Sequence, residues 1–156
     1  LVTRLPIDGS DKEWVLINIH LAAFDGGSKV RRRQLEAVLS YAIAQYDKGD
    51  HVIVGGDWNL EFVKSPFPHK TAAKYLFWIH PFPHELVPKG WNLAFDESVP
   101  SVRTVHKPYE PGSNYVAIID GYLSSPNVVV EDVAALETAF ENTDHQPVLA
   151  RFTAHQ

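Results

Sequence analysis

The chain has 156 residues, 45% of them hydrophobic and 12% aromatic, which is enough for one globular domain with a buried core and excludes a disordered chain. Its formal net charge of -5 argues against broad electrostatic adhesion to nucleic acid or anionic membranes but leaves specific phosphate contacts open. Without cysteine it has no disulfide or thiolate metal site, and with no apolar run near the roughly 20 residues that span a bilayer we expect a soluble chain.

Two β-rich stretches open the chain, at residues 1–7 and 14–20. The turn-forming residues 8–11 lie between them, so a β-hairpin is predicted. Because the first residue already falls in a predicted strand, we expect the chain to begin inside a domain. The sequence indicates no compartment, and removal of an upstream signal would place the chain outside the cytoplasm.

A helix and a buried strand follow. Apolar residues recur at helical spacing from residue 29 to residue 46, with Ser28 as the expected N-cap and Gly49 as the stop signal. Residues 51–55 are apolar and rich in β-branched side chains, which indicates a buried strand that runs into the polar residues Asp57 and Asn59. The succession of helix and strand predicts an α/β layer.

The second half of the chain is less regular. Residues 60–100 hold six prolines and many aromatic side chains, which form either a substrate-binding wall or a small satellite core. A helix is predicted at residues 70–79, and strands at residues 101–106, 115–123, 128–133 and 148–153. No repeat or linker interrupts the chain, so residues 1–156 are interpreted as a single domain.

Polar side chains with hydrolytic potential fall at the predicted strand ends. They are His20, Asp57 with Asn59, and Asp144 with His145. Hydrolysis of a phosphodiester needs a hard cation, an oriented water and donors for the developing charge. Carboxylate and amide oxygens suit Mg²⁺ or Mn²⁺, and no His/Cys arrangement suggests zinc.

Four motifs occur together in an order that resembles the endonuclease/exonuclease/phosphatase superfamily, which includes deoxyribonuclease I. They are residues 17–21 (INIHL), 54–59 (VGGDWN), 119–120 (ID) and 143–148 (TDHQPV). The resemblance runs from about residue 14 to residue 152 and matches the C-terminal half of the superfamily's domain. It implies half of a four-layer α/β/β/α sandwich, with a mixed sheet and flanking helices.

The resemblance also implies roles for individual residues. Asp57 orients or deprotonates the attacking water, and Asn59 fixes Asp57 and a phosphate oxygen. His20 and His145 hold the scissile phosphate. Asp120 pairs with His145, where it would favour a protonated imidazole. The metal ligands of this half would be Asp144, Asp57 and Asn59, for Mg²⁺ or alternatively Mn²⁺.

The superfamily's N-terminal half, with an Asn and a metal-binding Glu, has no counterpart in this sequence, so the expected metal site is incomplete. A lone half would also expose an apolar sheet face. We therefore expect the missing half to be supplied from elsewhere, or the chain to self-associate through its sheet.

The sequence supports three functional hypotheses. The first is divalent-metal-dependent hydrolysis of a phosphoester by in-line attack of water, with nucleic acid, nucleotide, lipid headgroup and sugar phosphate all open as substrates. The second is a non-catalytic half-domain that binds a phosphorylated ligand or a partner. The third and weakest is a divalent-metal binder, suggested by eight scattered histidines; His80 and His84 lie in a proline-rich segment that favours a surface loop.

Basic residues crowd the start of the predicted helix, at Lys29, Arg31, Arg32 and Arg33. Positive charge there opposes the helix dipole, which hints at phosphate steering. A solvated helix face is the favoured interpretation. Arg33 and Gln34 also resemble an Arg and a Gln that follow the His motif in the superfamily.

Overall fold

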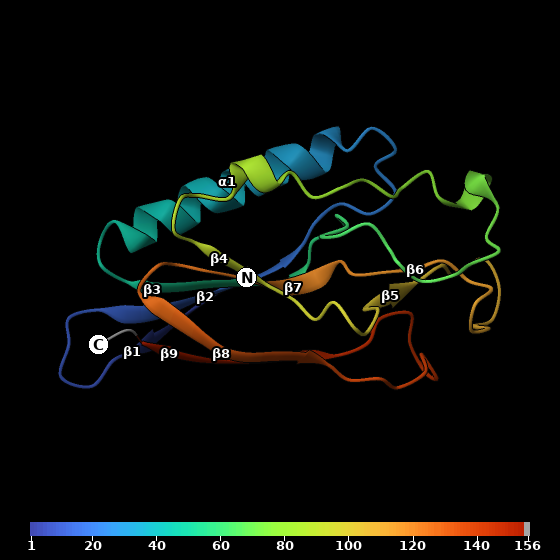
Figure 1. The fold of residues 1–156 in the computed structure, drawn as a ribbon. Helices are drawn as coiled ribbons and strands as arrows, with labels where there is room; N and C mark the ends of the chain where they lie inside the picture. The colour runs from blue at the N-terminus through green and yellow to red at the C-terminus, as the bar shows by residue number, and fades with distance from the viewer. Residues whose placement is uncertain (155–156) are drawn as a thin grey trace.

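A five-stranded mixed sheet forms the centre of the computed structural model, which describes residues 1–154 (Figure 1). β1 and β2 form the predicted antiparallel hairpin, β2 and β3 are parallel, and β7 runs antiparallel to both of its neighbours. In spatial order the strands are β1 (Val2–Pro6), β2 (Glu13–His20), β3 (His51–Asp57), β7 (Asp120–Ser124) and β4 (Asn92–Ala94). The prediction of a mixed sheet is confirmed.

Helix α1 (Lys29–Tyr46) covers one face of this sheet and makes the crossover that parallel strands require between β2 and β3 (Figure 1). Its buried apolar side chains pack against alternate residues of the two strands, and aromatic side chains extend the same core beyond the helix. The core includes Leu35, Leu39 and Ala42 of α1, Val15, Ile17, Val52 and Val54 of the sheet, and Trp58, Phe62 and Phe82.

The helix begins with a different cap from the predicted one. Ser28 adopts a left-handed conformation with φ of 53° and makes no side-chain capping bond. The carboxylate of Asp25 takes that place and accepts hydrogen bonds from the backbone N–H groups of Val30 (2.7 Å) and Arg31 (3.2 Å). The loop before α1 folds back far enough for Asp25 to reach the helix, which local sequence spacing did not indicate.

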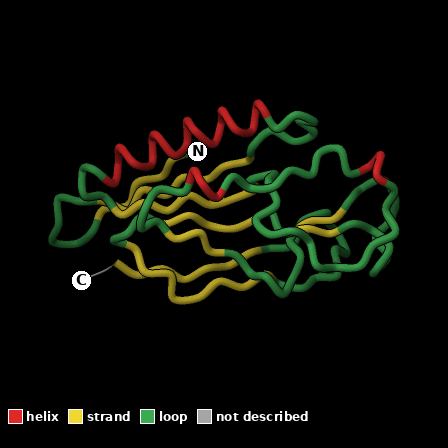
Figure 2. Tube along the Cα trace, turned by 45° about the horizontal axis from the view of Figure 1, so that its top comes forward, coloured by secondary structure: helices red, strands yellow, loops and turns green. Residues whose placement is uncertain are grey.

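A hairpin of β8 (Val128–Ala135) and β9 (Val148–Ala154) lies against the other face of the sheet (Figures 1 and 2). Phe152 packs edge-to-face on Tyr122 of β7, with ring centroids 5.4 Å apart, and the Tyr122 hydroxyl donates to the carbonyl of Val148 (2.7 Å). This hairpin adds a second β layer. Among the described residues α1 is the one α-helix, so a helix flanks one face of the sheet only.

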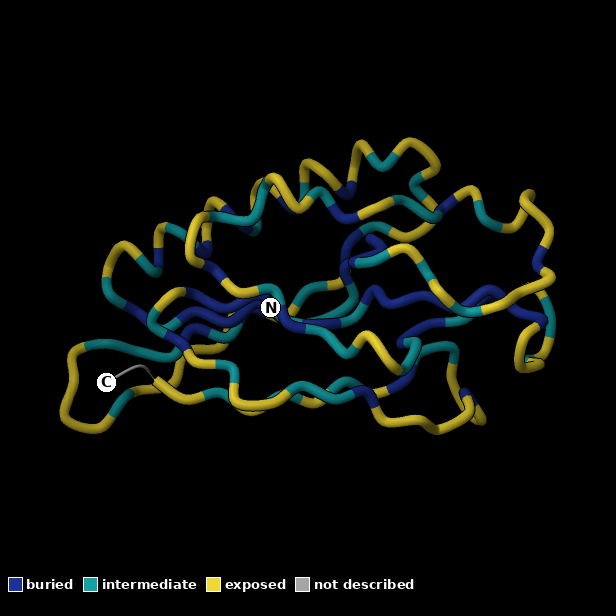
Figure 3. Tube along the Cα trace, viewed as in Figure 1, coloured by how far each residue is buried: buried dark blue, intermediate teal, exposed yellow. Residues whose placement is uncertain are grey.

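Several exposed residues on the side of the molecule away from α1 are apolar; Figure 3 marks exposed residues along this side of the chain. They lie at the N-terminus, on β1, on β8 and β9, and directly after β8. They are Leu1, Leu5, Val129, Leu136 and Leu149, and we call them the outer apolar surface. Val2 is also exposed but pairs with the core residue Ile17 and so faces α1.

Several predictions for the irregular segment are wrong. Residues 70–79 form only a short 3₁₀ turn, η1 (Ala73–Tyr75), and a second one, η2 (His84–Leu86), follows. The strand expected at residues 101–106 is reduced to β5 (Val102–Arg103). The one expected at residues 115–123 divides into β6 (Val116–Ala117), which pairs with β5, and β7. In the described part of the chain, no helix is both long and apolar enough to cross a membrane.

Candidate active site

Three predicted site residues form a row across the sheet. β2 ends at His20 and the parallel strand β3 ends at Asp57, so their ends meet at the same edge; β7 runs the other way and begins there with Asp120. His20 pairs with Asp57, and Asp57 pairs with Asp120. Paired residues in a sheet point to the same face, so the three side chains converge. The Nε2 atom of His20 lies 3.3 Å from Oδ2 of Asp57.

The turn after β3 holds Asp57 in place. Asn59 has a left-handed backbone with φ of 50°, which lets its amide face back along the chain. Its backbone N–H donates to Oδ1 of Asp57 (2.8 Å), and its Nδ2 donates to Oδ2 of Asp57 and to the Leu21 carbonyl (both 2.9 Å). Both carboxylate oxygens of Asp57 are therefore oriented by Asn59.

His145 completes the group from the segment before β9. Its Nδ1 is hydrogen-bonded to Oδ2 of Asp120 at 2.9 Å, and an ionised carboxylate in that position requires Nδ1 to carry a proton. Its Nε2 lies 3.8 Å from Oδ2 of Asp57. The structure thus brings Asp120 and His145 together and directs the second ring nitrogen toward Asp57.

Burial and charge shift the pKa values of two of these groups. Burial raises the pKa of the Asp57 carboxyl, and the charge of Asp120 adds to this effect, while His145, the Asn59 N–H and His20 offset only part of it. Burial alone would lower the pKa of His145. The hydrogen bond to Asp120 and the charges of Asp120, Asp57 and Asp144 outweigh burial, so the pKa of His145 is raised. Protonated His145 therefore persists to higher pH than an ordinary histidine.

Substitution Asp120→Asn is expected to lower the pKa of His145. It removes the strongest of the influences that raise this pKa and leaves the lowering by burial. NMR titration of the imidazole measures the change. Asp144→Asn is the matched control: the charge of Asp144 raises the pKa of His145 least, so its removal should lower that pKa less. A His145 pKa that is unchanged in Asp120→Asn would contradict this account.

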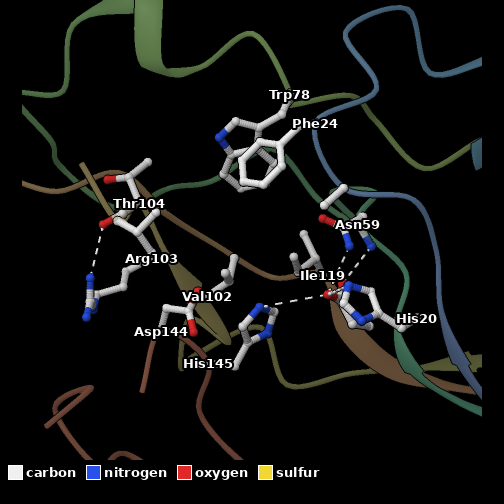
Figure 4. Close-up of a pocket in the computed structure, with 13 residues that line it drawn as sticks. His20, Phe24, Asn59, Trp78, Val102, Arg103, Thr104, Ile119, Asp144 and His145 are labelled. Atoms are coloured by element: carbon white, nitrogen blue, oxygen red, sulfur yellow. Dashed lines mark hydrogen bonds and ion pairs between the residues drawn. The ribbon is translucent and has the colours of Figure 1, made fainter. Parts of the chain in front are cut away.

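A cavity of about 300 Å³ lies over the group (Figure 4). It is lined by His20, Asp57, Asn59, Asp144 and His145. Asp120 accepts a hydrogen bond from His145. Figure 4 shows His20 and Asn59 on one side, with His145 and Asp144 below, and Phe24 and Trp78 above. The predicted site residues therefore surround one space.

The side chains around the cavity are the candidate ligands of a metal ion. Within residues 1–154, no group of three or more His, Asp or Glu side chains is placed to hold one. Both oxygens of Asp57 accept hydrogen bonds from Asn59, and Nδ2 of Asn59 is a donor in both of its bonds. The predicted ligands Asp57, Asn59 and Asp144 all border the cavity but do not make a cation site by themselves.

Arg31 is a site-supporting residue that the sequence interpretation missed. Its side chain is fully buried, not solvated, and its guanidinium donates to the carbonyls of Asn59, Trp78 (2.8 Å) and Asp25. It thus ties the turn that carries Asn59 to two loops of the cavity wall. Gln34 also faces inward, since its side-chain oxygen accepts a hydrogen bond from the backbone N–H of Ala22 (2.8 Å). Arg31 lies three residues before Gln34, on the same side of the helix, and this spacing was the sequence signal that could have indicated its burial.

Substitution Arg31→Lys is expected to lower the free energy of unfolding by about 2 kcal/mol. The single ammonium group of lysine cannot donate to all three carbonyls that the guanidinium group bonds. Urea denaturation measures the loss. Arg33→Lys, at an exposed position two residues along the same helix, should change stability by less than about 0.5 kcal/mol. Equal effects of the two substitutions would show that the buried contacts of Arg31 are not important.

The two histidines of the proline-rich segment are placed apart from this site. His80 Nε2 contacts the carbonyl of Gly26 at 3.0 Å, and His84 Nε2 contacts that of Phe62 at 2.8 Å. Each ring therefore has a backbone partner in the fold and serves to hold neighbouring loops.

Comparison with known proteins finds similar structures but no similar sequence. No family model and no curated protein matches. The crystal structure of D. rerio TDP2 complexed with a single-strand DNA product is similar at a TM-score of 0.64 and 17% identity, over 98% of this chain and 60% of that one. An endonuclease/exonuclease/phosphatase family protein and the mannosyl-6-phosphatase Bt3783, both from Bacteroides thetaiotaomicron, match at a TM-score of 0.51 and 16% identity. These two matches cover 93% and 91% of this chain and 51% and 52% of theirs.

At these identities the similarity establishes a fold. The chain spans 51–60% of the length of the three structures, which agrees with a mixed sheet that carries a helix on one face and only two strands on the other. The chain therefore has a deoxyribonuclease I-like fold and corresponds to about half of the length of these structures.

Proposed function

We propose that the chain carries the water-activating and phosphate-binding part of a phosphoester hydrolase. The observation that supports this most strongly is the row of His20, Asp57 and Asp120 across three neighbouring strands, with His145 joined to it through Asp120. A carboxylate with a raised pKa beside two imidazoles can accept a proton from water while the imidazoles face an anion.

In the proposed reaction, water attacks phosphorus in line with the leaving oxygen. Its oxygen forms the new P–O bond, its proton passes to a carboxylate oxygen of Asp57, and the bond to the leaving oxygen breaks. Nε2 of His20 and of protonated His145 donate to the phosphoryl oxygens, whose negative charge they offset. Asn59 keeps Asp57 aligned; both of its Nδ2 hydrogens are donated to Asp57 and to the Leu21 carbonyl, so none is left for a phosphoryl oxygen. Asp120 keeps His145 protonated.

We propose that the complete enzyme needs Mg²⁺, for which Mn²⁺ can substitute. A divalent cation supplies Lewis-acid stabilisation of a phosphoryl oxygen. Asp144, Asp57 and Asn59, which line the same cavity, would be the ligands from this chain, and further oxygen ligands would come from outside it.

We propose that residues 1–156 form one part of a larger domain and that its other α/β half covers the outer apolar surface. Its five side chains are 39–87% exposed, and the chain spans 51–60% of the similar structures. Sedimentation velocity of this chain tests the idea, because an unpartnered surface of this kind favours self-association. A stable monomer at high concentration would count against it.

A second candidate is a non-catalytic half-domain that binds a phosphorylated ligand or a partner. It is favoured by one observation, namely that the described residues do not make a cation site by themselves. The two candidates use the same side chains and differ in turnover. The substrate class stays open between nucleic acid, nucleotide, lipid and sugar phosphate, since one similar structure holds a DNA product and another is a sugar phosphatase by name.

The test is hydrolysis of bis(4-nitrophenyl) phosphate by this chain in Mg²⁺, with EDTA as the control. Turnover that EDTA abolishes supports the hydrolase proposal. Absence of turnover, together with phosphate binding that is lost in His145→Ala, would favour the binding half-domain. Turnover that is insensitive to EDTA would contradict the proposed Mg²⁺ requirement.

A further inference from the structure

The cavity over the site has two chemically different sides (Figure 4). One side presents the carboxylates, the amide and the imidazoles described above. Opposite them lie Phe24 and Trp78, and Val102 and Ile119 lie between these rings and the polar residues (Figure 4). Val105, Arg103 and Thr104 also line the cavity. A phosphate group would use only the first side, so the apolar side calls for a separate explanation.

Phe24 combines two features that cost stability. Its side chain is 64% exposed, and its backbone has φ of 55°, in the left-handed region that bulky residues rarely adopt. The ring lies against Phe77, itself 53% exposed, with centroids 6.2 Å apart and an interplanar angle of 29°. Exposed aromatic side chains in a strained loop beside a cavity point to ligand binding, because folding alone does not explain them.

Trp78 supplies a second aromatic surface on the same side. Its indole N–H donates to the carbonyl of Tyr75 at 3.1 Å, and its carbonyl is held by Arg31. The polar atom of the indole is therefore already paired, and the part of the ring that borders the cavity is apolar; Trp78 is only 9% exposed, so this part is small. Val102 and Ile119, both almost fully buried, pack with Trp78 in one cluster and close this side.

We propose that this apolar side binds a flat aromatic group attached to the phosphoester, so that the substrate is an aromatic phosphoester rather than a phosphate of an open-chain or carbohydrate alcohol. The inference rests on the proposed function, since the polar side is taken to hold the phosphate. A volume of about 300 Å³ is at the lower end for small-molecule sites and has room for a ring beside a phosphate.

The physical reason is a difference in desolvation. A flat ring can stack on the exposed ring of Phe24 and contact the part of Trp78 that borders the cavity without giving up hydrogen bonds. Sugar hydroxyl groups placed there would lose bonds to water and regain few. A nucleobase and a simple aryl group share this chemistry, and binding experiments can separate them.

The test is calorimetric titration of this chain with three ligands in the same Mg²⁺ buffer. Phenyl phosphate carries a simple aryl group, thymidine 5′-monophosphate carries a nucleobase, and ribose 5-phosphate carries neither. We expect at least one aromatic ligand to bind about tenfold more tightly than ribose 5-phosphate, as base stacking on aromatic side chains commonly gives. Preference for the first ligand would identify an aryl ester, and preference for the second a nucleotide.

Variants test whether the tighter binding of aromatic ligands depends on the apolar side of the cavity. Phe24→Ala should remove most of it and leave ribose 5-phosphate binding unchanged, and Trp78→Leu should weaken it while keeping an apolar side chain in the cluster. Tyr41→Ala, at an exposed aromatic residue of α1 that does not line the cavity, should keep the full preference. Since Phe24 is mostly exposed, its removal should not prevent folding.

The outcomes separate this inference from the proposed function. Equal binding of all three ligands that is lost in His145→Ala would overturn the aromatic subsite and leave the phosphate site standing. An aromatic preference that survives in Phe24→Ala and Trp78→Leu would also overturn it. If none of the ligands binds, the proposed phosphate site fails and the inference falls with it.

Discussion

Substitution Asp57→Asn is expected to reduce Mg²⁺-dependent turnover of bis(4-nitrophenyl) phosphate by about 100- to 10,000-fold, the usual contribution of a positioned general base. The amide keeps the size of the side chain but cannot accept the proton from the attacking water. The raised pKa of Asp57 also sets the pH dependence. Turnover should fall as the pH drops through that pKa, which lies above the ordinary aspartate value, because the basic form is then lost.

The matched control is Asp132→Asn, which removes a carboxylate from an exposed position of β8 and should leave turnover unchanged. Thermal unfolding of both variants checks that the fold is retained. An Asp57→Asn protein that is folded and retains more than about a tenth of the turnover would show that Asp57 is not the base.

Substitution Gly56→Ala is expected to lower the free energy of unfolding by more than about 4 kcal/mol, the range of exceptional single changes. A Cβ atom at this position would overlap the carbonyl oxygen of Ile19, and the backbone has φ of 136°. Gly56 lies in β3 directly before Asp57, where β2 is the hydrogen-bonded neighbour. Relief of the overlap would push these two strands apart at the row of His20 and Asp57.

A second glycine separates steric overlap from backbone conformation. Gly112 has φ of 71°, and a Cβ there would meet nothing within 4 Å. Gly112→Ala should therefore lower the free energy of unfolding by only about 1 kcal/mol, the cost of placing alanine in a left-handed conformation. Urea denaturation compares the two variants. A similar loss in both would mean that the close approach of β2 and β3 at Gly56 is not what requires glycine.

The sheet and much of the site could be predicted because their signals are local. Residues 14–20 end in His20, and the apolar run at residues 51–55 is followed two residues later by Asp57. Parallel strands joined by one helix must end at the same edge. This is why His20 and Asp57 come together as their positions suggested. Asp120 was placed through the superfamily motif, and its pairing with Asp57 across β3 and β7 is consistent with that alignment.

Features set by long-range contacts were not predicted. The apolar run at residues 115–123 looks like one strand, but the carbonyls of Ile118 and Ile119 accept from the backbone N–H groups of Phe62 and Trp58 and so split it. Arg31 looks like its exposed neighbours in the sequence, and only the convergence of three carbonyls on one point explains its burial. Phe24 belongs to none of the sequence motifs, so its place in the cavity wall could not be predicted.

The most direct test of the phosphate site is NMR of the histidine side chains during titration with inorganic phosphate. The account predicts that His20 and His145 respond along the same saturation curve, because their rings border one cavity. His51, at the opposite end of β3, should not respond. Shifts at His51 equal to those at His20 and His145, or separate curves for the latter two, would contradict a single phosphate site.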